Sequence, residues 1–420
     1  MKKIALYHNL TSGGSKKELY EFSVRFMKEG WTVDLFIHDR NVENFLPLDK
    51  LVNACIVDNY RLLKKFSKPL PFLKSPLHFF FFLINIRRIR SSSKRLAAKI
   101  NAGNYDMAFI HHNKDLVQSP FILRYLKCRK VYYCAEAQRE FYERGLSNYL
   151  NNTCRIEKTG QSGFGHLLLN LYKPIIDFWD RPFSMAEYSL RRYFDYSNIQ
   201  YSDCVLTNSN FSRENLLAGY GISSDVVYLG TNIPRLSSDN IANTDSVVSI
   251  GAIGPMKGYH FLIESLAHVP ATKRPRLILI GNSLNMAYKN YINLLAKQSS
   301  VEIEILVDVS EDTLIKKTQE SRIFLYAPYL EPFGLTPLEA MACGIPVIAV
   351  NEGGPRESIV HGITGLLVNR NKIDFGKAIE DLLDNKDKRQ ELAIAAREQI
   401  VKFWNWDAAY DRLKSVIFPN

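Results

Sequence analysis

The sequence predicts an α/β protein of two domains, each a parallel sheet of Rossmann type covered by helices. Its 420 residues are more than one ordinary hydrophobic core holds, so two domains are expected. Strand-like and helix-like segments alternate along both halves of the chain, an order that favours parallel sheets. A stretch rich in Ser, Asn and Asp, residues 231–245, separates the two series and is the predicted linker.

The N-terminal series begins with a short apolar strand, residues 4–7, and a loop that contains Gly13 and Gly14. A helix over residues 16–28 and a strand over 31–37 follow, which completes a strand–loop–helix–strand unit. The glycine pair would let the backbone approach a phosphate or a sugar, or would only form a tight turn. It lacks the G-x-G-x-x-G spacing of dinucleotide-binding loops, so the pattern alone leaves both interpretations open.

The next predicted strand, residues 105–112, ends in two histidines, His111 and His112. A helix over 120–126 and a strand over 130–134 continue the series. Open α/β sheets bind ligands at the C-terminal ends of their strands, so a histidine there is a candidate functional residue. The alternative is a structural histidine, the commoner role of an isolated one.

The second series is predicted to form a doubly wound sheet of its own. Its strands are expected at residues 247–250, 277–280, 301–306, 323–326, 347–350 and 366–368. Two such domains joined by a linker create a cleft, the usual place for a ligand that is contacted from both sides. A last helix is expected from Trp406 onward, with apolar residues at helical spacing.

The net charge of +11 and the pI near 9.2 indicate an anionic partner: a nucleotide, a nucleic acid or an acidic membrane surface. A nucleic-acid binder is disfavoured because the basic residues gather around one apolar patch and do not alternate with aromatic stacking platforms. The six cysteines form no C-x-x-C pair, which indicates reduced thiols in a cytoplasmic protein. No signal peptide is expected, since three residues lead straight into the first strand.

Residues 61–95 carry many Lys and Arg on both sides of a Phe-rich apolar run, residues 77–84. The run is about half of the ~20 residues that cross a bilayer, so it does not predict a transmembrane helix. Two alternatives remain: a buried helix with basic flanks, or an interfacial element that sets Phe among acyl chains and Lys and Arg against anionic headgroups. Residues 145–195, aromatic and basic, are interpreted as an insertion with helices.

The most informative stretch runs from residue 329 to 350. Thr336, Pro337 and Glu339 have the spacing of a capping box, and Gly344 stands where a left-handed residue ends a helix. The helix N-terminus would then offer an anion site. The amides expected there belong to Phe333, Gly334, Leu335 and Thr336.

Two carboxylates bracket that site, Glu331 before the turn and Glu339 in the first helical turn. Amides suit phosphates and carboxylates accept hydrogen bonds from sugar hydroxyls, so the pattern suits a ligand with a diphosphate and hydroxylated rings. In the alternative interpretation, Glu339 only closes the capping box and Glu331 is a solvated loop residue. A second glycine pair, Gly353 and Gly354, is either another phosphate- or base-proximal turn or a plain strand–helix connection.

The run E-P-F-G-L-T-P-L-E-A-M-A-C-G-I-P-V-I-A resembles the E-x7-E signature of family four of the retaining glycosyltransferases, which have the GT-B fold. The resemblance implies two Rossmann-like domains that face each other across a deep cleft. It implies an acceptor-side domain over residues 1–235, a nucleotide-sugar-binding domain over 236–403, and a helix over 404–420 that returns to the first domain.

The resemblance also implies roles for single residues. Glu331 would hold the donor sugar, Glu339 the ribose diol, and Lys257 the diphosphate, while the four amides of residues 333–336 would lie near sugar or phosphate. Gly14 would face the cleft, and His111, or alternatively His112, would point into it beside the donor sugar. The expected catalytic residues are therefore Glu331, His111 and Lys257.

Three further positions carry alternatives. The family usually has Arg where this chain has Ala252, so another cation or the helix amides must compensate, or the site is weakened. Glu136 and Arg139, in a block that resembles polysaccharide-modifying members of the family, either line the acceptor side or form a structural ion pair. No D-x-D motif stands in a suitable loop, so no metal is expected and Lys257 and helix amides would stabilise the leaving group.

The function implied is metal-independent, retaining transfer of a sugar from a UDP- or GDP-linked donor to a surface-polysaccharide or lipid-linked acceptor. The nucleotide sugar is a co-substrate and no cofactor is expected. The protein would be cytoplasmic, with peripheral contact at the inner face of the cell membrane through residues 61–95 as an open alternative. A catalytically weakened binding subunit of the same fold and a nucleotide-sugar epimerase are the other functions to test.

Overall fold

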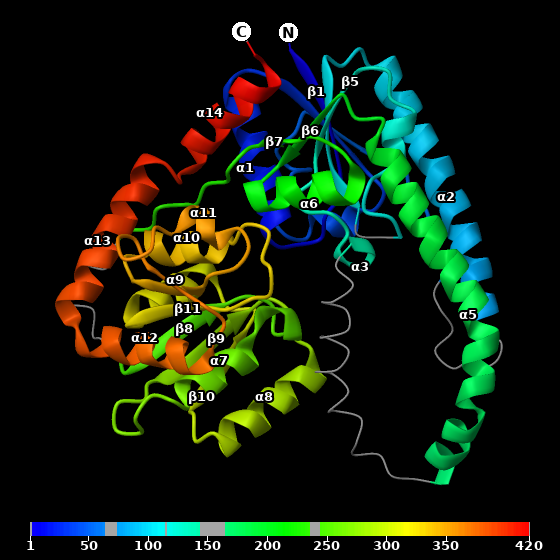
Figure 1. Cartoon of the computed structure of the whole chain (residues 1–420). Helices are drawn as coiled ribbons and strands as arrows, with labels where there is room; N and C mark the ends of the chain where they lie inside the picture. The colour runs from blue at the N-terminus through cyan, green and yellow to red at the C-terminus, as the bar shows by residue number, and fades with distance from the viewer. Residues whose placement is uncertain (1, 64–73, 114–115, 143–163, 236–243, 420) are drawn as a thin grey trace.

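The structure is a computed structural model that describes residues 2–63, 74–113, 116–142, 164–235 and 244–419, with the backbone alone for 74, 75, 142 and 164–180. Within these ranges the chain forms two parallel sheets covered by helices, with the N-terminal domain beside the C-terminal one (Figure 1). The α/β class and the two-sheet organisation are as the sequence predicts.

The N-terminal sheet has the strand order β3-β2-β1-β4-β5-β6-β7, with every pairing parallel. Its strands are β1 (Lys3–Asn9), β2 (Thr32–Ile37), β3 (Ala54–Val57), β4 (Met107–Asn113), β5 (Arg129–Tyr133), β6 (Cys204–Thr207) and β7 (Asp225–Val226). The central strand β1 is buried on both faces, as Ile4 and Tyr7 are fully enclosed, which explains why it reads as a continuous apolar run.

The helices of this domain include two long ones that run side by side along one flank of the domain, α2 (Lys74–Ala102) and α5 (Phe164–Ile199) (Figure 1). The others are α1 (Gly14–Lys28), α3 (Arg139–Tyr142) and α6 (Asn210–Tyr220), with short 3-10 turns η1 (Arg40–Glu43) and η3 (Phe121–Arg124). The helix expected over 120–126 is therefore only one short turn. The helical insertion expected within 145–195 corresponds, in its described part, to α5.

The C-terminal sheet has the order β10-β9-β8-β11-β12-β13, again parallel. Its strands are β8 (Ser246–Ile250), β9 (Arg276–Gly281), β10 (Ile303–Val307), β11 (Ile323–Tyr326), β12 (Val347–Val350) and β13 (Leu366–Val368). The helices around it are α7 (Tyr259–Leu266), α8 (Met286–Gln298), α9 (Glu311–Glu320), α10 (Leu335–Ala342), α11 (Pro355–Ser358), α12 (Lys372–Asp384) and α13 (Lys386–Lys402), with the turn η5 (Pro255–Lys257).

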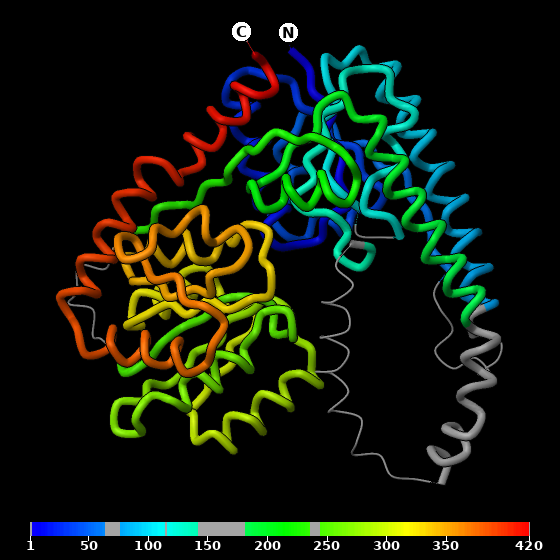
Figure 2. The backbone as a smooth tube through the Cα atoms, viewed as in Figure 1, coloured from blue at the N-terminus to red at the C-terminus, as the bar shows by residue number. Residues whose placement is uncertain are grey.

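The last helix, α14 (Trp406–Ile417), leaves the C-terminal domain and packs on α1 of the N-terminal domain (Figure 2). Edge-to-face ring contacts join the two helices, with centroids 6.0 Å apart for Trp406 and Phe22 and 5.3 Å apart for Tyr410 and Phe26. Such pairs add ~0.5–1.5 kcal/mol each beyond the area that they bury. Helix α14 thus connects the C-terminal domain to α1 of the N-terminal domain.

Candidate active site between the two domains

The site is centred on the loop that joins β11 to α10, which carries Glu331. The Lys257 ammonium, in the turn after β8, lies 2.8 Å from the Glu331 carboxylate. Strands β8 and β11 are neighbours in the sheet, so both residues stand at the C-terminal edge where open α/β sheets bind ligands. The structure therefore brings together two residues that lie 74 positions apart in the sequence.

The charge state of Glu331 follows from its surroundings. Burial alone would raise the pKa of this carboxyl, but the Lys257 ammonium and, more weakly, the guanidinium of Arg139 outweigh burial and hold the pKa below its ordinary value. Glu331 is thus ionised at neutral pH and accepts hydrogen bonds only. A carboxylate in that state suits ligand hydroxyls.

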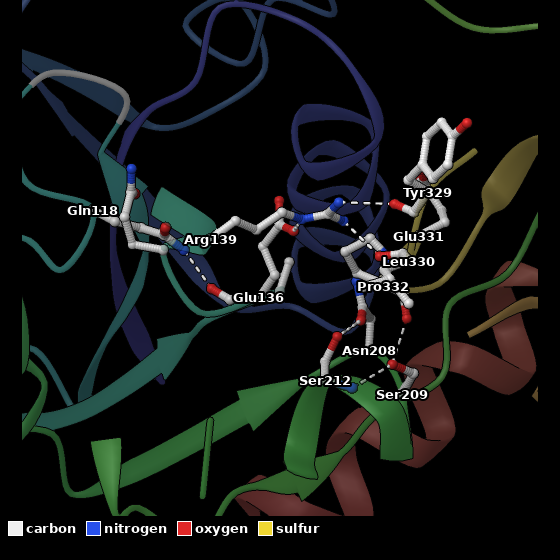
Figure 3. Close-up of polar contacts among 12 residues, drawn as sticks. Gln118, Glu136, Arg139, Asn208, Ser209, Ser212, Tyr329, Leu330, Glu331 and Pro332 are labelled. Atoms are coloured by element: carbon white, nitrogen blue, oxygen red, sulfur yellow. Dashed lines mark hydrogen bonds and ion pairs between the residues drawn. The ribbon is translucent and has the colours of Figure 1, made fainter. Parts of the chain in front are cut away.

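An arginine from each domain holds the loop in place. Arg139 of the N-terminal domain donates to the carbonyls of Tyr329 at 3.0 Å and Leu330 at 2.8 Å (Figure 3). Arg370 of the C-terminal domain donates to the two preceding carbonyls, those of residues 327 and 328, and its guanidinium lies 3.9 Å from the centre of the Tyr329 ring. Leu330 has φ +45°, a conformation that costs ~1–3 kcal/mol and persists only where its surroundings enforce it.

The second glycine pair packs against the same loop. The Gly354 amide donates to the Glu331 carbonyl at 2.8 Å, and Gly353 has φ +63°. A Cβ on Gly354 would clash with the Pro332 carbonyl and the Phe333 backbone. These glycines allow the close approach that fixes the position of Glu331. The turn is a strand–helix connection with a positioning role, and its proximity to a phosphate or base stays a prediction.

The predicted capping box is wrong. Helix α10 begins at Leu335, two residues before Pro337, and its N-cap is Gly334 with φ +90°, which has no side-chain cap. Thr336 lies within the helix, so Glu339 has no capping partner there. The left-handed Gly344 that follows the helix has φ +77°, as predicted. The amides at the start of α10 lack partners within the helix, as in any helix N-terminus.

Glu339 instead reaches the other domain. Its carboxylate lies 2.7 Å from the ammonium of Lys17, in the first turn of α1. Burial would lower the pKa of Lys17, but the Glu339 carboxylate raises it above its ordinary value. Next to this ion pair, a Cβ on Gly14 would lie 3.1 Å from Leu335 Cδ1, so the starts of α1 and α10 are in contact. Gly14 therefore faces the C-terminal domain.

His111 does not line this site, and the expectation that it points into the cleft is wrong. The residue is fully buried, its ring stacks on Tyr133 at 5.3 Å, and its Nε2 lies 3.5 Å from the buried carboxylate of Glu18 in α1. Burial lowers the pKa of His111 well below its ordinary value. Successive side chains of a strand alternate between the two faces of the sheet, and that of His111 faces α1. His112 is half-buried.

Glu136 and Arg139 form the ion pair that was one of their two alternatives, with Nε and Oε2 2.6 Å apart. Arg139 also reaches the C-terminal domain, which the sequence did not indicate (Figure 3). Both residues line a pocket of about 130 Å³ between the domains, together with Ala137, Phe211, Asn215, Ala218, Gly219 and Pro332. An acceptor-side role for Glu136 and Arg139 remains a prediction.

Two further contacts between the domains were not predicted from the sequence. The Ser209 hydroxyl, at the N-cap of α6, donates to the Pro332 carbonyl at 2.5 Å (Figure 3). The carboxylate of Glu357 accepts the amides of Asn210 and Phe211, both at 2.8 Å. The local sequence indicates only that Ser209 and Asn210 can start a helix. A helix N-terminus favours an acidic partner, but the sequence does not identify that partner as Glu357.

Neither a metal cluster nor a membrane-spanning helix is present in the described part of the chain. Its acidic, His and Cys side chains include no group of three placed to hold a metal ion. None of its helices is both long and apolar enough to cross a bilayer. The cysteines at positions 55, 128, 134, 204 and 343 are free thiols.

Two Rossmann-like domains with a shared site and a C-terminal helix that returns to the first domain define the GT-B class of glycosyltransferase folds. The family model described as Glycosyl transferases group 1 matches residues 237–399, the part that carries Lys257, Glu331 and Glu339. This part of the chain therefore matches the group 1 glycosyltransferases, and the fold of the described residues is of GT-B type.

Two mannosyltransferases illustrate the sequence relationship. The chain is 27% identical over 238 residues to human alpha-1,3/1,6-mannosyltransferase ALG2, a match that covers 50% of this chain and 57% of that protein. It is 26% identical over 239 residues to the GDP-mannose-dependent alpha-(1-6)-phosphatidylinositol monomannoside mannosyltransferase of Mycobacterium tuberculosis, with 50% and 60% covered. The matches thus span less than two thirds of the length of these relatives.

Solved structures agree in fold along nearly the whole chain. Anabaena HepE, solved in complex with UDP and glucose, superposes with a TM-score of 0.68 at 18% identity and 99% coverage of both chains. The sucrose-phosphate synthase of Thermosynechococcus elongatus gives a TM-score of 0.70 at 17% identity, with 99% and 98% covered. At this level of identity the likeness establishes the fold.

Proposed function

We propose that the protein transfers a sugar from a UDP- or GDP-linked donor to a surface-polysaccharide or lipid-linked glycan acceptor, with retention of configuration and without a metal ion. The observation that carries this proposal is the ion pair of Glu331 with Lys257, together with Glu339 on the helix that follows the Glu331 loop, where it contacts Lys17 of the other domain. The carboxylates can accept hydrogen bonds from the hydroxyls of a nucleotide sugar, and the ammonium groups can donate to its phosphates.

The relatives favour the same class of reaction. One relative is named for its use of GDP-mannose and acts on a phosphatidylinositol mannoside, and a structural neighbour was solved with UDP-glucose. These names support a nucleotide-sugar donor and an acceptor that carries glycan or lipid. They leave UDP and GDP as the two nucleotides to compare.

In the reaction, the bond between the sugar's anomeric carbon and the diphosphate oxygen breaks, and a bond to the acceptor hydroxyl oxygen forms on the same face. The leaving phosphate oxygen takes the acceptor's proton, so no separate general base is required. Lys257 and the amides at the start of α10 would stabilise the charge that develops on the diphosphate. Glu331 would orient the sugar, and Glu339 the ribose.

Contact with an anionic membrane surface is a second part of the proposal. On α2, Phe80 and Leu83 are 57% and 42% exposed, and Arg87 and Lys94 continue the same exposed face at helical spacing. The opposite face, with Phe82, packs into an apolar cluster. The helix is thus buried on one face and exposed on the other, and membrane contact of its exposed face is the proposal. An exposed apolar end followed by basic residues suits acyl chains and acidic headgroups.

A basic pocket adjoins that face. It has a volume of about 570 Å³ and is lined by Tyr60, Arg61, Leu62, Leu63, Arg88, Ser91 and Arg95. Part of its charge is already compensated, because Arg95 pairs with Asp58 at 2.7 Å. The remaining guanidinium groups extend the positive surface of α2, which favours peripheral binding of a cytoplasmic protein at the inner face of the membrane.

The catalytic proposal is tested by nucleotide release from UDP- and GDP-sugars with the purified full chain, with and without lipid-linked acceptors. Glu331→Gln should lower turnover about a hundredfold or more, since it removes the charge that faces the sugar. Glu398→Gln, an exposed change on α13, should leave turnover unchanged. Donor binding without turnover would identify a binding subunit. Interconversion of nucleotide sugars without acceptor would identify an epimerase.

A further inference from the structure

The two carboxylates of the site share one arrangement. Each is held by one lysine: Glu331 by Lys257 within the C-terminal domain, and Glu339 by Lys17 across the domain contact. The nitrogen–oxygen distances are 2.8 and 2.7 Å. All four side chains are partly accessible, between 20% and 26% exposed, so a ligand can reach both pairs.

The four charges cancel before any ligand binds. A nucleotide sugar brings neutral hydroxyls on its two rings and two negative charges on its diphosphate. If the hydroxyls donate hydrogen bonds to the carboxylates, the two ammonium groups become available for the two phosphate charges, and each carboxylate keeps hydrogen-bond donors in place of its lysine. Burying an unpaired charge is costly, so this exchange of partners is favoured over one in which an ammonium loses its carboxylate and gains nothing.

The position of Lys17 fits the exchange. It lies in the first turn of α1, whose start contacts the start of α10 at Gly14 and Leu335. The Lys17 ammonium lies 2.7 Å from Glu339 of α10 and therefore close to the start of that helix, where a diphosphate would be bound. The loop that follows β8, residues 251–258, supplies one cation, Lys257. A second cation from the opposite domain would enclose the diphosphate from both sides.

We propose that Lys17 is a diphosphate-binding residue of the donor site. When the ribose hydroxyls donate to the Glu339 carboxylate, the Lys17 ammonium leaves Glu339 and binds the phosphates. The inference rests on the proposed function, because it requires a nucleotide ligand. It makes donor binding depend on the N-terminal domain. The competing explanation is that Lys17 only fastens the two domains together.

The two explanations predict different effects of Lys17 on the affinity for ligands with and without phosphates. The experiment measures the binding of UDP, GDP, uridine and guanosine by ligand-detected NMR titration. This method also detects dissociation constants in the millimolar range. Lys17→Met should weaken binding of the nucleoside diphosphate about ten- to a hundredfold, the value of a charge-assisted hydrogen bond, and leave nucleoside binding unchanged. Lys17→Arg should restore most of the diphosphate affinity.

The matched control is Lys28→Met, which removes an exposed lysine from the last turn of the same helix and should change neither affinity. Equal losses for nucleoside and nucleoside diphosphate in Lys17→Met, or no loss for either, would overturn the role of Lys17 and leave the domain-fastening explanation. A wild-type protein that binds none of the four ligands would instead overturn the proposed function, and this inference with it. Melting temperatures of the variants establish that each is folded.

Discussion

The carboxylate of Glu357, in the C-terminal domain, accepts a hydrogen bond from the backbone amide of Phe211, in the N-terminal domain, at 2.8 Å. The Asn210 amide and the Tyr228 hydroxyl donate to the same carboxylate, also at 2.8 Å. A side chain of one domain thus satisfies the N-terminus of a helix in the other. This contact, with Lys17–Glu339 and the Arg139 guanidinium, holds the domains in the observed arrangement.

We expect Glu357→Ala to lower the free energy of unfolding by ~1–2 kcal/mol, the range for loss of a helix N-cap, because it leaves two amides of α6 without an acceptor. Urea denaturation with two probes measures the change. Glu398→Ala on α13 is the control and should shift the midpoint very little, since the residue is exposed. Equal stability of the two variants would show that the Glu357 contact does not stabilise the protein.

The strands of both sheets could be predicted because parallel strands are buried on both faces and read as apolar runs. Val347–Val350 is an example, with every residue at most 1% exposed. Strand β3 (Ala54–Val57) escaped prediction, since its four residues are only half-buried and lack a longer run. The identity of Lys257, Glu331 and Glu339 as site candidates came from a motif, and their meeting is visible only in three dimensions.

Other features depend on geometry that the local sequence does not contain. Thr336 and Glu339 have capping-box spacing, yet a left-handed Gly334 starts the helix earlier and sends Glu339 toward Lys17. His111 ends a strand at the ligand-binding edge, but alternation alone does not say which face α1 covers. Contacts such as Lys17–Glu339 join residues 322 positions apart, so no periodicity predicts them.

The close packing beneath Glu331 predicts the effect of a single methyl group. Gly354→Ala would push the backbone of residues 331–333 away, because the new Cβ clashes with the Pro332 carbonyl. We expect turnover to fall about a hundredfold, since a displacement of 1 Å at a reacting group has effects of that size. Gly362→Ala is the matched control: its φ of +77° makes alanine strained there, but nothing lies within 4 Å of the new Cβ. It should lose stability and keep turnover, whereas loss of turnover in both variants would contradict the positioning role.

Acid should destabilise the protein through its buried histidines. Burial, helped by Arg370, lowers the pKa of His260 from 6.5 to about 4. A depressed pKa means that the unfolded chain binds the proton first. The stabilising contribution is therefore complete above pH 6.5 and is lost as pH falls toward 4, up to ~3 kcal/mol.

The measurement is the free energy of unfolding between pH 7 and 5. His260→Asn should reduce the slope by up to one proton, about 1.4 kcal/mol per pH unit. His268→Asn, at an exposed position of the same region, should leave the slope as in the wild type. An unchanged slope in His260→Asn would show that His260 does not contribute to the acid transition.

Membrane binding should depend on the exposed face of α2. We expect the wild type to co-sediment with vesicles that contain phosphatidylglycerol at low salt, and less with zwitterionic vesicles, because charge and apolar contact act together. Phe80→Ser with Leu83→Ser removes the apolar part and should weaken binding about tenfold. Raising the salt to 0.5 M should weaken it further by screening.

Ile394→Ser with Val401→Ser is the control for that experiment, since both residues are exposed apolar side chains on α13 of the other domain, at 61% and 53%. This pair should not change sedimentation. A wild type that stays in the supernatant with anionic vesicles at low salt would disprove the membrane contact, as would equal losses in the two double variants.

The last prediction concerns Ala252, the position where the resemblance described in the first subsection implies an Arg. If Lys17 supplies the second cation, Ala252→Arg should raise turnover less than tenfold in the wild-type background, because the diphosphate is already enclosed by two ammonium groups. The same change in a Lys17→Met background should recover at least tenfold of the lost turnover, since one added guanidinium replaces one lost ammonium. The measurement is the turnover of the wild type, the two single variants and the double variant, compared as a double-mutant cycle. A gain of two orders of magnitude from Ala252→Arg alone would mean that the native site lacks a cation, and would favour a catalytically weakened protein.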